Sequence, residues 1–154
     1  MNFTTHTKIS IKSFTLIELI IVIIIVGILA SLGLTQYSSV VEKSRLVEAK
    51  IRIGVMRNLA YQYYLENGTL EGLREEDVDV EVVPNCVSTS FYSYYLLSNF
   101  PPVVSLAAGR CTSGGKTPNA AREYVYYLEF NPSTGSDTWH CFYMDGSSCF
   151  GLPG

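Results

Sequence analysis

Residues 14–34 of the chain read FTLIELIIVIIIVGILASLGL, and this stretch decides which fold the sequence can adopt. Its 21 residues contain a single ionisable side chain, Glu18. As an α-helix the stretch would be roughly 32 Å long, because each residue adds about 1.5 Å. That length is sufficient to cross a hydrocarbon core of about 30 Å. The stretch therefore predicts a transmembrane helix, preceded by the short, basic segment 1–13.

The helical pattern continues past the apolar stretch, and residues 35–67 form the predicted amphipathic half of the same helix. Apolar side chains recur every four residues on one face, which we expect to pack against a globular partner: Val47, Ile51, Val55, Leu59 and Tyr63, flanked by Met56, Ala60 and Tyr64. Glu42 and Arg45 lie on the opposite face, three residues apart, where they can pair. Asn67-Gly68 predicts the end of the helix, because glycine readily takes the left-handed conformation.

The composition and charge limit the classes of function. Hydrophobic residues make up 47% of the chain and charged residues 16%, with a formal net charge of −3. Soluble domains typically contain about 25% charged residues. The shortage of charge reflects the apolar helix, and the acidic balance predicts no general affinity for nucleic acid.

The remaining residues predict a loop followed by a sheet. Residues 69–89 contain an acidic stretch and a proline, so we expect an ordered loop with at most a short turn. Alternating apolar and polar residues between Pro- and Gly-containing turns predict four strands, at 91–97, 103–108, 122–130 and 138–144.

Four cysteines follow the apolar stretch and predict two disulfides in an oxidising compartment. They include no Cys-x2-Cys pair of the kind that zinc sites use, so we expect no metal. The strand order favours Cys86–Cys111 and Cys141–Cys149, one of three connectivities that four cysteines allow. In this pairing the first two strands return the chain to Cys86, and a turn after the last strand returns Cys149 to Cys141.

The segment Lys12-Ser13-Phe14-Thr15-Leu16-Ile17-Glu18-Leu19-Ile20 resembles the processing motif of type IV prepilins and type II secretion pseudopilins. The resemblance implies that a membrane peptidase removes residues 1–13 as a leader by cutting between Ser13 and Phe14, and that Phe14 is then N-methylated. It also implies that Glu18 serves assembly by meeting the Phe14 amine of a neighbouring subunit. The alternative for Glu18 is a carboxylate that reaches the lipid headgroups. The chain departs from the family at Ser13, where Gly is usual, and near Thr35, where many members have Pro.

From this resemblance we expect a pilin-like α+β fold, in which the long N-terminal helix packs on a small antiparallel β-sheet. The expected function is that of a structural subunit of a type IV pilus-like filament (a fimbrium), without enzymatic activity or cofactor. Two alternatives remain open: a pseudopilin of a type II secretion system, and a membrane-tethered binding or adhesion module that does not polymerise.

The resemblance also implies the partners and the location. The expected partners are other copies of the chain, the inner membrane, the prepilin peptidase and N-methyltransferase, and the pilus or secretion assembly machinery. The precursor would be a single-pass inner-membrane protein with an extracytoplasmic C-terminal domain. After assembly the chain would lie in a pilus at the cell surface, or in the periplasm if it is a pseudopilin.

Three other motifs carry weaker expectations. Residues 113–117, Ser-Gly-Gly-Lys-Thr, end like a phosphate-binding loop, but the position of the required upstream glycine is Arg110 and a predicted strand follows. His140 alternates along a strand, so we expect a packed or solvated ring in place of a catalytic base. Residues 67–69 match the Asn-x-Thr glycosylation triplet and double as the predicted helix end.

Overall fold

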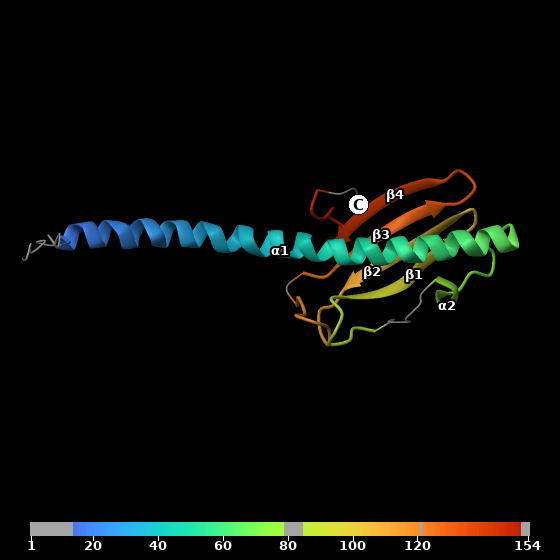
Figure 1. The fold of residues 1–154 in the computed structure, drawn as a ribbon, viewed down its shortest axis with the longest axis horizontal. Coiled ribbons are helices and arrows are strands. Elements are labelled where there is room, and N and C mark those ends of the chain that lie inside the picture. The colour runs from blue at the N-terminus through green and yellow to red at the C-terminus, as the bar shows by residue number, and fades with distance from the viewer. Residues whose placement is uncertain (1–13, 79–84, 121, 152–154) are drawn as a thin grey trace, which may run out of the picture. The chain divides into compact units, whose positions relative to one another are not determined.

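The computed structural model of the chain describes residues 14–78, 85–120 and 122–151 (Figure 1). The elements are α1 (Leu16–Asn67), α2 (Glu75–Val78), β1 (Tyr92–Phe100), β2 (Val103–Arg110), β3 (Tyr124–Asn131) and β4 (Ser136–Tyr143). The strands form one sheet in the order β1-β2-β3-β4, and each pair of neighbours is antiparallel. The chain divides into two compact units, one up to Val40 and one from Val41 onward. The second unit contains the sheet and the part of α1 that packs on it.

The architecture is α+β, a long N-terminal helix with a four-stranded antiparallel sheet, as the sequence predicts. The four predicted strands are confirmed, with ends that differ from the prediction by three residues or fewer. The helix ends as predicted at Asn67, where Gly68 has a φ of 72° and its N–H donates to the Tyr64 oxygen at 2.8 Å. The predicted loop contains one helical turn, α2, and residues 79–84 lie outside the described residues.

The face of α1 that packs on the sheet differs from the one that the four-residue repeat predicts. Val47, Ile51 and Val55 are 58%, 66% and 45% exposed, so the prediction was wrong for these three residues. The buried residues of this part of α1 are Leu46, Ala49, Ile53, Met56 and Ala60. Leu59 and Tyr63 are half-buried at the border of the contact.

Two apolar stripes on the same helix explain this error. The buried residues recur at alternating spacings of three and four residues and the exposed ones at spacings of four, and both patterns are typical of one face of a helix. Ala49 and Ala60 have no exposed surface, and their small side chains allow the helix backbone to approach the strands closely.

Cationic side chains border the buried face of α1 and lie over aromatic rings of the second unit. The pairs are Arg45 with Phe91, Arg52 with Tyr94, Lys50 with Trp139 and Arg57 with Phe130, at 4.9, 4.9, 5.4 and 4.4 Å from the cationic centre to the ring centroid. Arg57 also forms an ion pair with Asp137 at 3.2 Å. Cation–aromatic contacts at exposed sites contribute about 0.5–1 kcal/mol each. These cations therefore reinforce the contact between the helix and its own sheet.

A buried ion pair joins α1 to the end of β2. The side chain of Arg110 has no exposed surface, and its Nε donates to Glu42 Oε2 at 3.0 Å. Its terminal N–H groups donate to the backbone oxygens of Phe91, Cys111 and Thr117 at 2.9, 3.2 and 2.7 Å. The sequence pattern predicts that Glu42 lies opposite the apolar stripe and pairs with Arg45; the Arg45 contact is present, but Glu42 also turns toward the sheet. One guanidinium thus connects the helix with three separate backbone segments.

Two tyrosines complete the surroundings of Glu42. The Tyr124 hydroxyl donates to Glu42 Oε2 at 3.1 Å and lies 2.9 Å from the Tyr92 hydroxyl. Burial by itself raises the pKa of Glu42, but the hydrogen bonds and charge of Arg110, followed by Tyr124 and Arg45, lower it overall. Burial raises the pKa of Tyr92 to about 12 and also raises the pKa of Tyr124. At neutral pH the cluster therefore holds an ionised carboxylate beside two neutral phenols.

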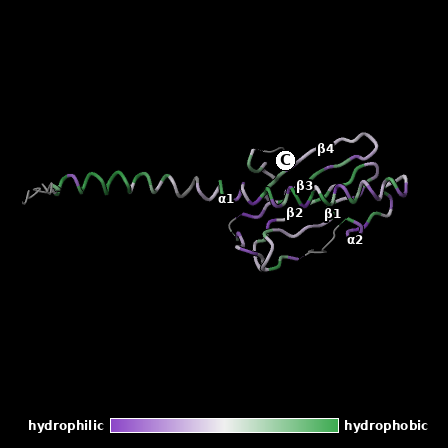
Figure 2. Tube along the Cα trace, in the orientation of Figure 1, coloured by the Kyte–Doolittle hydropathy of each residue, from purple (hydrophilic) through white to green (hydrophobic). Residues whose placement is uncertain are grey.

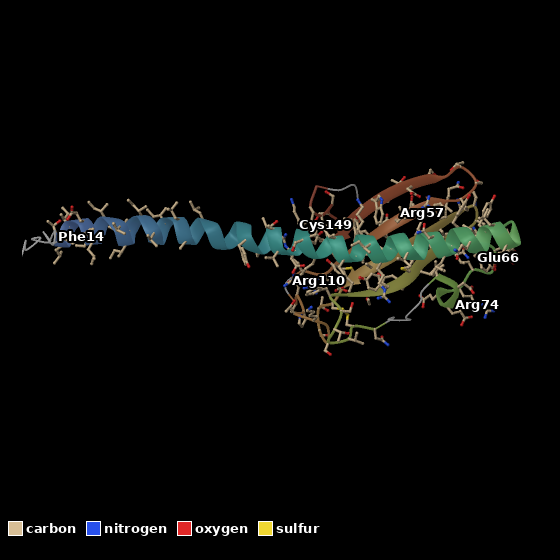
Figure 3. All side chains as sticks on the ribbon, in the orientation of Figure 1. Phe14, Arg57, Glu66, Arg74, Arg110 and Cys149 are labelled. Atoms are coloured by element: carbon tan, nitrogen blue, oxygen red, sulfur yellow. A yellow bond between two sulfur atoms is a disulfide. The ribbon has the colours of Figure 1, made fainter. Side chains whose placement is uncertain are left out.

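Two disulfides join Cys86 to Cys111 and Cys141 to Cys149, which is the connectivity predicted from the strand order. Their Cα atoms lie 5.7 and 5.2 Å apart, within the usual range of about 4.4–6.8 Å. The second bridge returns the tail to β4, where the Cys149 N–H donates to the Cys141 oxygen at 3.0 Å. In Figure 3 the labelled Arg110 and Cys149 lie at the same end of the sheet.

We expect Glu42→Gln to lower the free energy of unfolding by roughly 3 kcal/mol, because it leaves the buried Arg110 guanidinium without a counter-charge. The folded-state pKa of Glu42 is lowered, so its contribution is present above about pH 4.5 and is lost as the pH falls through the folded pKa. The variant should lack this part of the acid dependence.

Denaturant unfolding of the full chain in neutral detergent, followed by tyrosine fluorescence between pH 3 and pH 7, measures both effects. Glu66→Gln is the control, because Glu66 is an exposed acid of the same helix and its replacement should change stability by less than about 0.5 kcal/mol. Equal stability and equal acid dependence of the two variants would contradict the role of the ion pair.

Candidate functional site

The start of α1 carries a capping box formed by Thr15 and Glu18. The Thr15 backbone N–H and hydroxyl both donate to Glu18 Oε2, at 2.8 Å each. In return the Glu18 N–H donates to Thr15 Oγ1 at 3.3 Å. Thr15 is therefore the N-cap residue and Glu18 the third residue of the helix, a reciprocal pair that satisfies backbone N–H groups at the helix start.

This cap gives Glu18 a partner within its own chain. Residues 15–18 match the Ser/Thr-x-x-Glu pattern of a capping box. The prediction that Glu18 pairs with another subunit did not take this pattern into account. A cut before Phe14 would leave the Thr15 peptide N–H in place, so the cap is compatible with both the precursor and the mature chain. Phe14 is 76% exposed, whereas Ser13 and the rest of segment 1–13 lie outside the described residues. The processing roles of Ser13 and Phe14 and the assembly role of Glu18 stay predictions.

The first part of α1 presents apolar side chains on all sides. Between Leu16 and Leu32 the large hydrophobic side chains are 41–76% exposed. Figure 2 shows the same stretch as an almost unbroken hydrophobic segment. By length and composition α1 can cross a membrane, and it is the one such helix in the part of the chain that the structure describes. Exposing a surface of this kind to water is unfavourable, so lipid or other apolar helices are its natural surroundings.

A second apolar surface lies on the part of α1 within the second unit, on the side turned away from the sheet. It consists of Val47, Ile51, Val55 and Leu65, which we call the exposed apolar face. Val47, Ile51 and Val55 follow each other at four-residue spacing, and Leu65 lies five helical turns after Val47. Leu65 is 64% exposed, so this face extends along most of the second part of the helix.

The glycine-rich loop 112–117 serves packing instead of phosphate binding. A Cβ atom on Gly115 would lie 2.4 Å from Cys111 Cβ, so glycine is required where the loop crosses the Cys86–Cys111 disulfide. The ammonium of Lys116 lies over the Phe91 ring, 4.9 Å from its centroid. This contact gives Lys116 a structural role in the loop.

The other candidate residues also have structural roles. His140 stacks on Tyr127 with ring centroids 4.8 Å apart, the packed position that was expected. The Asn67 amide donates to the Tyr63 oxygen at 2.9 Å and so belongs to the helix end. Among residues 14–78, 85–120 and 122–151, no group of three or more His, Cys, Asp or Glu side chains is arranged to hold a metal ion.

Comparison with known proteins points to the N-terminal segment. The family model described as the prokaryotic N-terminal methylation motif matches residues 10–34. This range includes the predicted cleavage position, Phe14 and the Thr15–Glu18 capping box. No solved structure matches the chain.

Three relatives illustrate what the chain is similar to. It is 44% identical over 57 residues to a fimbrial protein, EcpC, of Eikenella corrodens (37% of each chain). It is 45% identical over 56 residues to a probable minor fimbrial protein of Dichelobacter nodosus (36% of this chain, 35% of the relative). It is 37% identical over 76 residues to a type IV major pilin protein, PilE1, of Neisseria gonorrhoeae (46% of each chain).

The chain thus matches between about a third and a half of the length of these relatives. The similarity supports common ancestry of the matched segment, and the rest of the chain is described by its own structure. The methylation motif, these relatives and the fold of a long helix on an antiparallel sheet agree with one another and support a relationship to the type IV pilin family, which the chain resembles most in its N-terminal segment.

Proposed function

We propose that this chain is a structural subunit of a type IV pilus-like filament and assembles through α1. One observation carries the proposal: α1 has apolar surfaces that the described part of the chain leaves uncovered. They run on all sides between Leu16 and Leu32, and along the exposed apolar face from Val47 to Leu65. The similarity to proteins named fimbrial protein and type IV pilin supports the same function.

The two apolar surfaces differ in what can cover them. The stretch from Leu16 to Leu32 has one ionisable side chain, so lipid suits it before assembly and like helices suit it afterwards. The part of α1 that carries the exposed apolar face contains seven charged residues from Glu42 to Arg57. Charged residues cost about 2.5–3.5 kcal/mol each at the centre of a membrane helix, so lipid is an unfavourable cover there. A protein surface fits better, and a second copy offers an apolar stripe of the same spacing.

The N-terminal segment supports maturation before assembly. The methylation motif covers residues 10–34, which motivates removal of segment 1–13 and N-methylation of Phe14. Residues 14–34 would anchor the precursor in the inner membrane. The second unit would lie outside the cytoplasm, where its two disulfides are stable. The assembled chain would then be found at the cell surface.

The alternatives predict different locations. A pseudopilin of a type II secretion system would share the N-terminal segment and remain in the periplasm. A tethered module that does not polymerise would stay in the membrane fraction. Micrographs of the surface fraction, labelled for this chain, separate the three: labelled surface filaments support the proposal, and their absence contradicts it.

We expect filaments to contain a chain that begins with N-methylated Phe14. The physical reason is that cleavage before Phe14 retains the whole apolar stretch that filament packing needs. Mass spectrometry of the N-terminal peptide from purified filaments measures the start and the added methyl group. Cells that lack the prepilin peptidase are the control and should retain Met1. A leader still present in filaments, or cleavage after Ala30, would show that the maturation part of the proposal is wrong.

We expect Glu18→Ala to leave export and cleavage intact and to reduce filament yield strongly. The reason is that a subunit without this carboxylate cannot pair with a neighbour's Phe14 amine in apolar surroundings. Filament yield by sedimentation, with total chain level by immunoblot, measures the effect.

The capping box requires two further variants to identify which property of Glu18 matters. Glu18→Gln keeps a capping acceptor but loses the charge, whereas Thr15→Val keeps the charge and loses the capping hydroxyl, at about 1 kcal/mol of helix stability. If charge pairing drives assembly, Glu18→Gln fails as Glu18→Ala does and Thr15→Val still assembles. Normal filaments from Glu18→Gln would instead assign Glu18 to the cap alone.

We expect Ile51→Glu to abolish filament formation while the second unit stays folded. Ile51 is 66% exposed, so the substitution disturbs little within the chain but places a carboxylate on the exposed apolar face. Ile51→Leu is the matched control, because it keeps the apolar surface and should assemble. Chain level and intact disulfides report folding. Wild-type filament yield from the glutamate variant would refute packing through this face.

A further inference from the structure

The face of the sheet turned away from α1 carries a row of aromatic side chains. The strand register aligns Tyr95, Ala107, Tyr127 and His140 across β1 to β4. Their neighbours in sequence, such as Tyr94 and Tyr126, face the buried core, so this row faces outward. The next row contains Phe142, whose ring meets the edge of Tyr127 at 5.9 Å between centroids. We call Tyr95, Tyr127, His140 and Phe142 the outer aromatic row.

Small residues make room for these rings over the sheet. Ala107, between Tyr95 and Tyr127, has no exposed surface. A Cβ atom on Gly109 would lie 3.3 Å from the Tyr95 ring, which shows that this ring extends over the neighbouring strand. Tyr127 is nearly parallel to His140, with an angle of 14° between the rings. The rings of the outer aromatic row are therefore half-buried and pack against one another, with Tyr127 stacked on His140 and at 75° to Phe142.

The carboxylates of Glu123 and Glu129 lie beside the outer aromatic row. Burial, followed by the negative charge of Glu123, raises the pKa of Tyr95. Burial and then Glu129 raise the pKa of Tyr127 in the same way. Glu129 is two residues after Tyr127 in β3, so the alternation of the strand places it on the same face as the row. Glu129 also lies 3.6 Å from His140 Nε2.

On the outer side of the four described strands there is no lysine or arginine. The four described strands contain a single Lys or Arg, Arg110, which is buried on the helix side. Elsewhere the chain uses its cations on other rings: Arg45, Lys50, Arg52, Arg57, Arg110, Lys116 and Arg122 lie over Phe91, Tyr92, Tyr94, Phe130, Trp139 or Tyr143. An aromatic face beside carboxylates attracts cations, because the ring quadrupole presents its negative side.

We propose that the outer aromatic row, together with Glu123 and Glu129, is a docking surface for an arginine- or lysine-bearing segment of a partner protein. Charge complementarity carries this assignment: rings and carboxylates lie together on a strand surface without Lys or Arg. The same arrangement disfavours nucleic acid and anionic lipid, whose phosphates would meet Glu123 and Glu129. It also disfavours the outer face of a second copy, which would bring like charges together. The proposal is independent of filament assembly through α1.

The test measures binding of a fluorescein-labelled hexa-arginine peptide to the full chain in neutral detergent by fluorescence anisotropy. Two variants remove parts of the surface: Tyr127→Leu removes a ring, and Glu129→Gln removes a charge. Two matched controls keep it: Tyr127→Phe retains the ring, and Glu71→Gln removes an exposed carboxylate elsewhere. A neutral hexaglycine peptide and a neutral oligosaccharide, each carrying the same label, complete the set.

We expect each of the two surface variants to weaken hexa-arginine binding about two- to fivefold, and their combination roughly five- to tenfold. The controls should bind as the unmodified chain does, and binding should weaken as salt is added. Equal weakening by Glu71→Gln and Glu129→Gln would overturn the proposal, because it would indicate attraction to net charge alone. If the neutral oligosaccharide binds and its binding depends on Tyr127, the proposal that the partner is cationic is wrong. If hexa-arginine binds every variant equally well, the proposal that the outer aromatic row is the binding site is wrong.

Discussion

The rest of the structure depends on how one helix divides its surface between a side that packs on its own sheet and sides that stay exposed. Ala49 and Ala60 give α1 a narrow face that can approach the strands closely, and the large apolar side chains next to it remain outside. A helix that buried all its apolar residues in its own sheet would have no surface left for lipid or for copies of itself. The two demands are compatible because they use different sides, or different stretches, of the same helix. The borders of the sheet contact are then closed by cations over rings, such as Arg57 over Phe130.

Much of this fold can be predicted from the sequence, and the parts that cannot share a physical cause. The apolar stretch 14–34, the stop at Gly68 and the alternation in 122–130 predict the elements, because each is a local signal. The disulfide connectivity follows from strand order. The orientation of α1 does not follow, because the stripe from Val47 to Val55 and the stripe from Ala49 to Ala60 both have spacings that are typical of one face of a helix. Choosing between them requires knowledge of how closely the sheet approaches, which is a property of the three-dimensional structure.

The contacts of Glu18 were also only partly predicted from the sequence. The resemblance of residues 12–20 to a processing motif suggests that the Glu18 carboxylate pairs with a group of another subunit. The local pattern Thr15-x-x-Glu18 already supplies one, through three hydrogen bonds within the chain. The two interpretations need not exclude each other, since a carboxylate has acceptor capacity for more than one donor. A capped Glu18 is also pre-oriented, so pairing with an amine would require little further ordering of its side chain.

Arg110 could not be assigned from sequence, because its partners are far apart along the chain. A lysine would supply one compact ammonium, whereas the guanidinium offers five N–H donors in a fixed plane. This chain uses them on Glu42 and on the backbone of Phe91, Cys111 and Thr117. The same residue therefore connects α1, the segment before β1, the Cys86–Cys111 disulfide and the loop 112–117. Losing Glu42 would leave the buried guanidinium without its counter-charge, so the contacts at this end of the sheet support one another. An apolar residue at position 110 would pack, but it would remove the guanidinium donor to Thr117 and leave the Phe91 and Cys111 carbonyls with their backbone donors alone. Glu42 would keep Tyr124 and Arg45 but would lose the partner that ties α1 to β2.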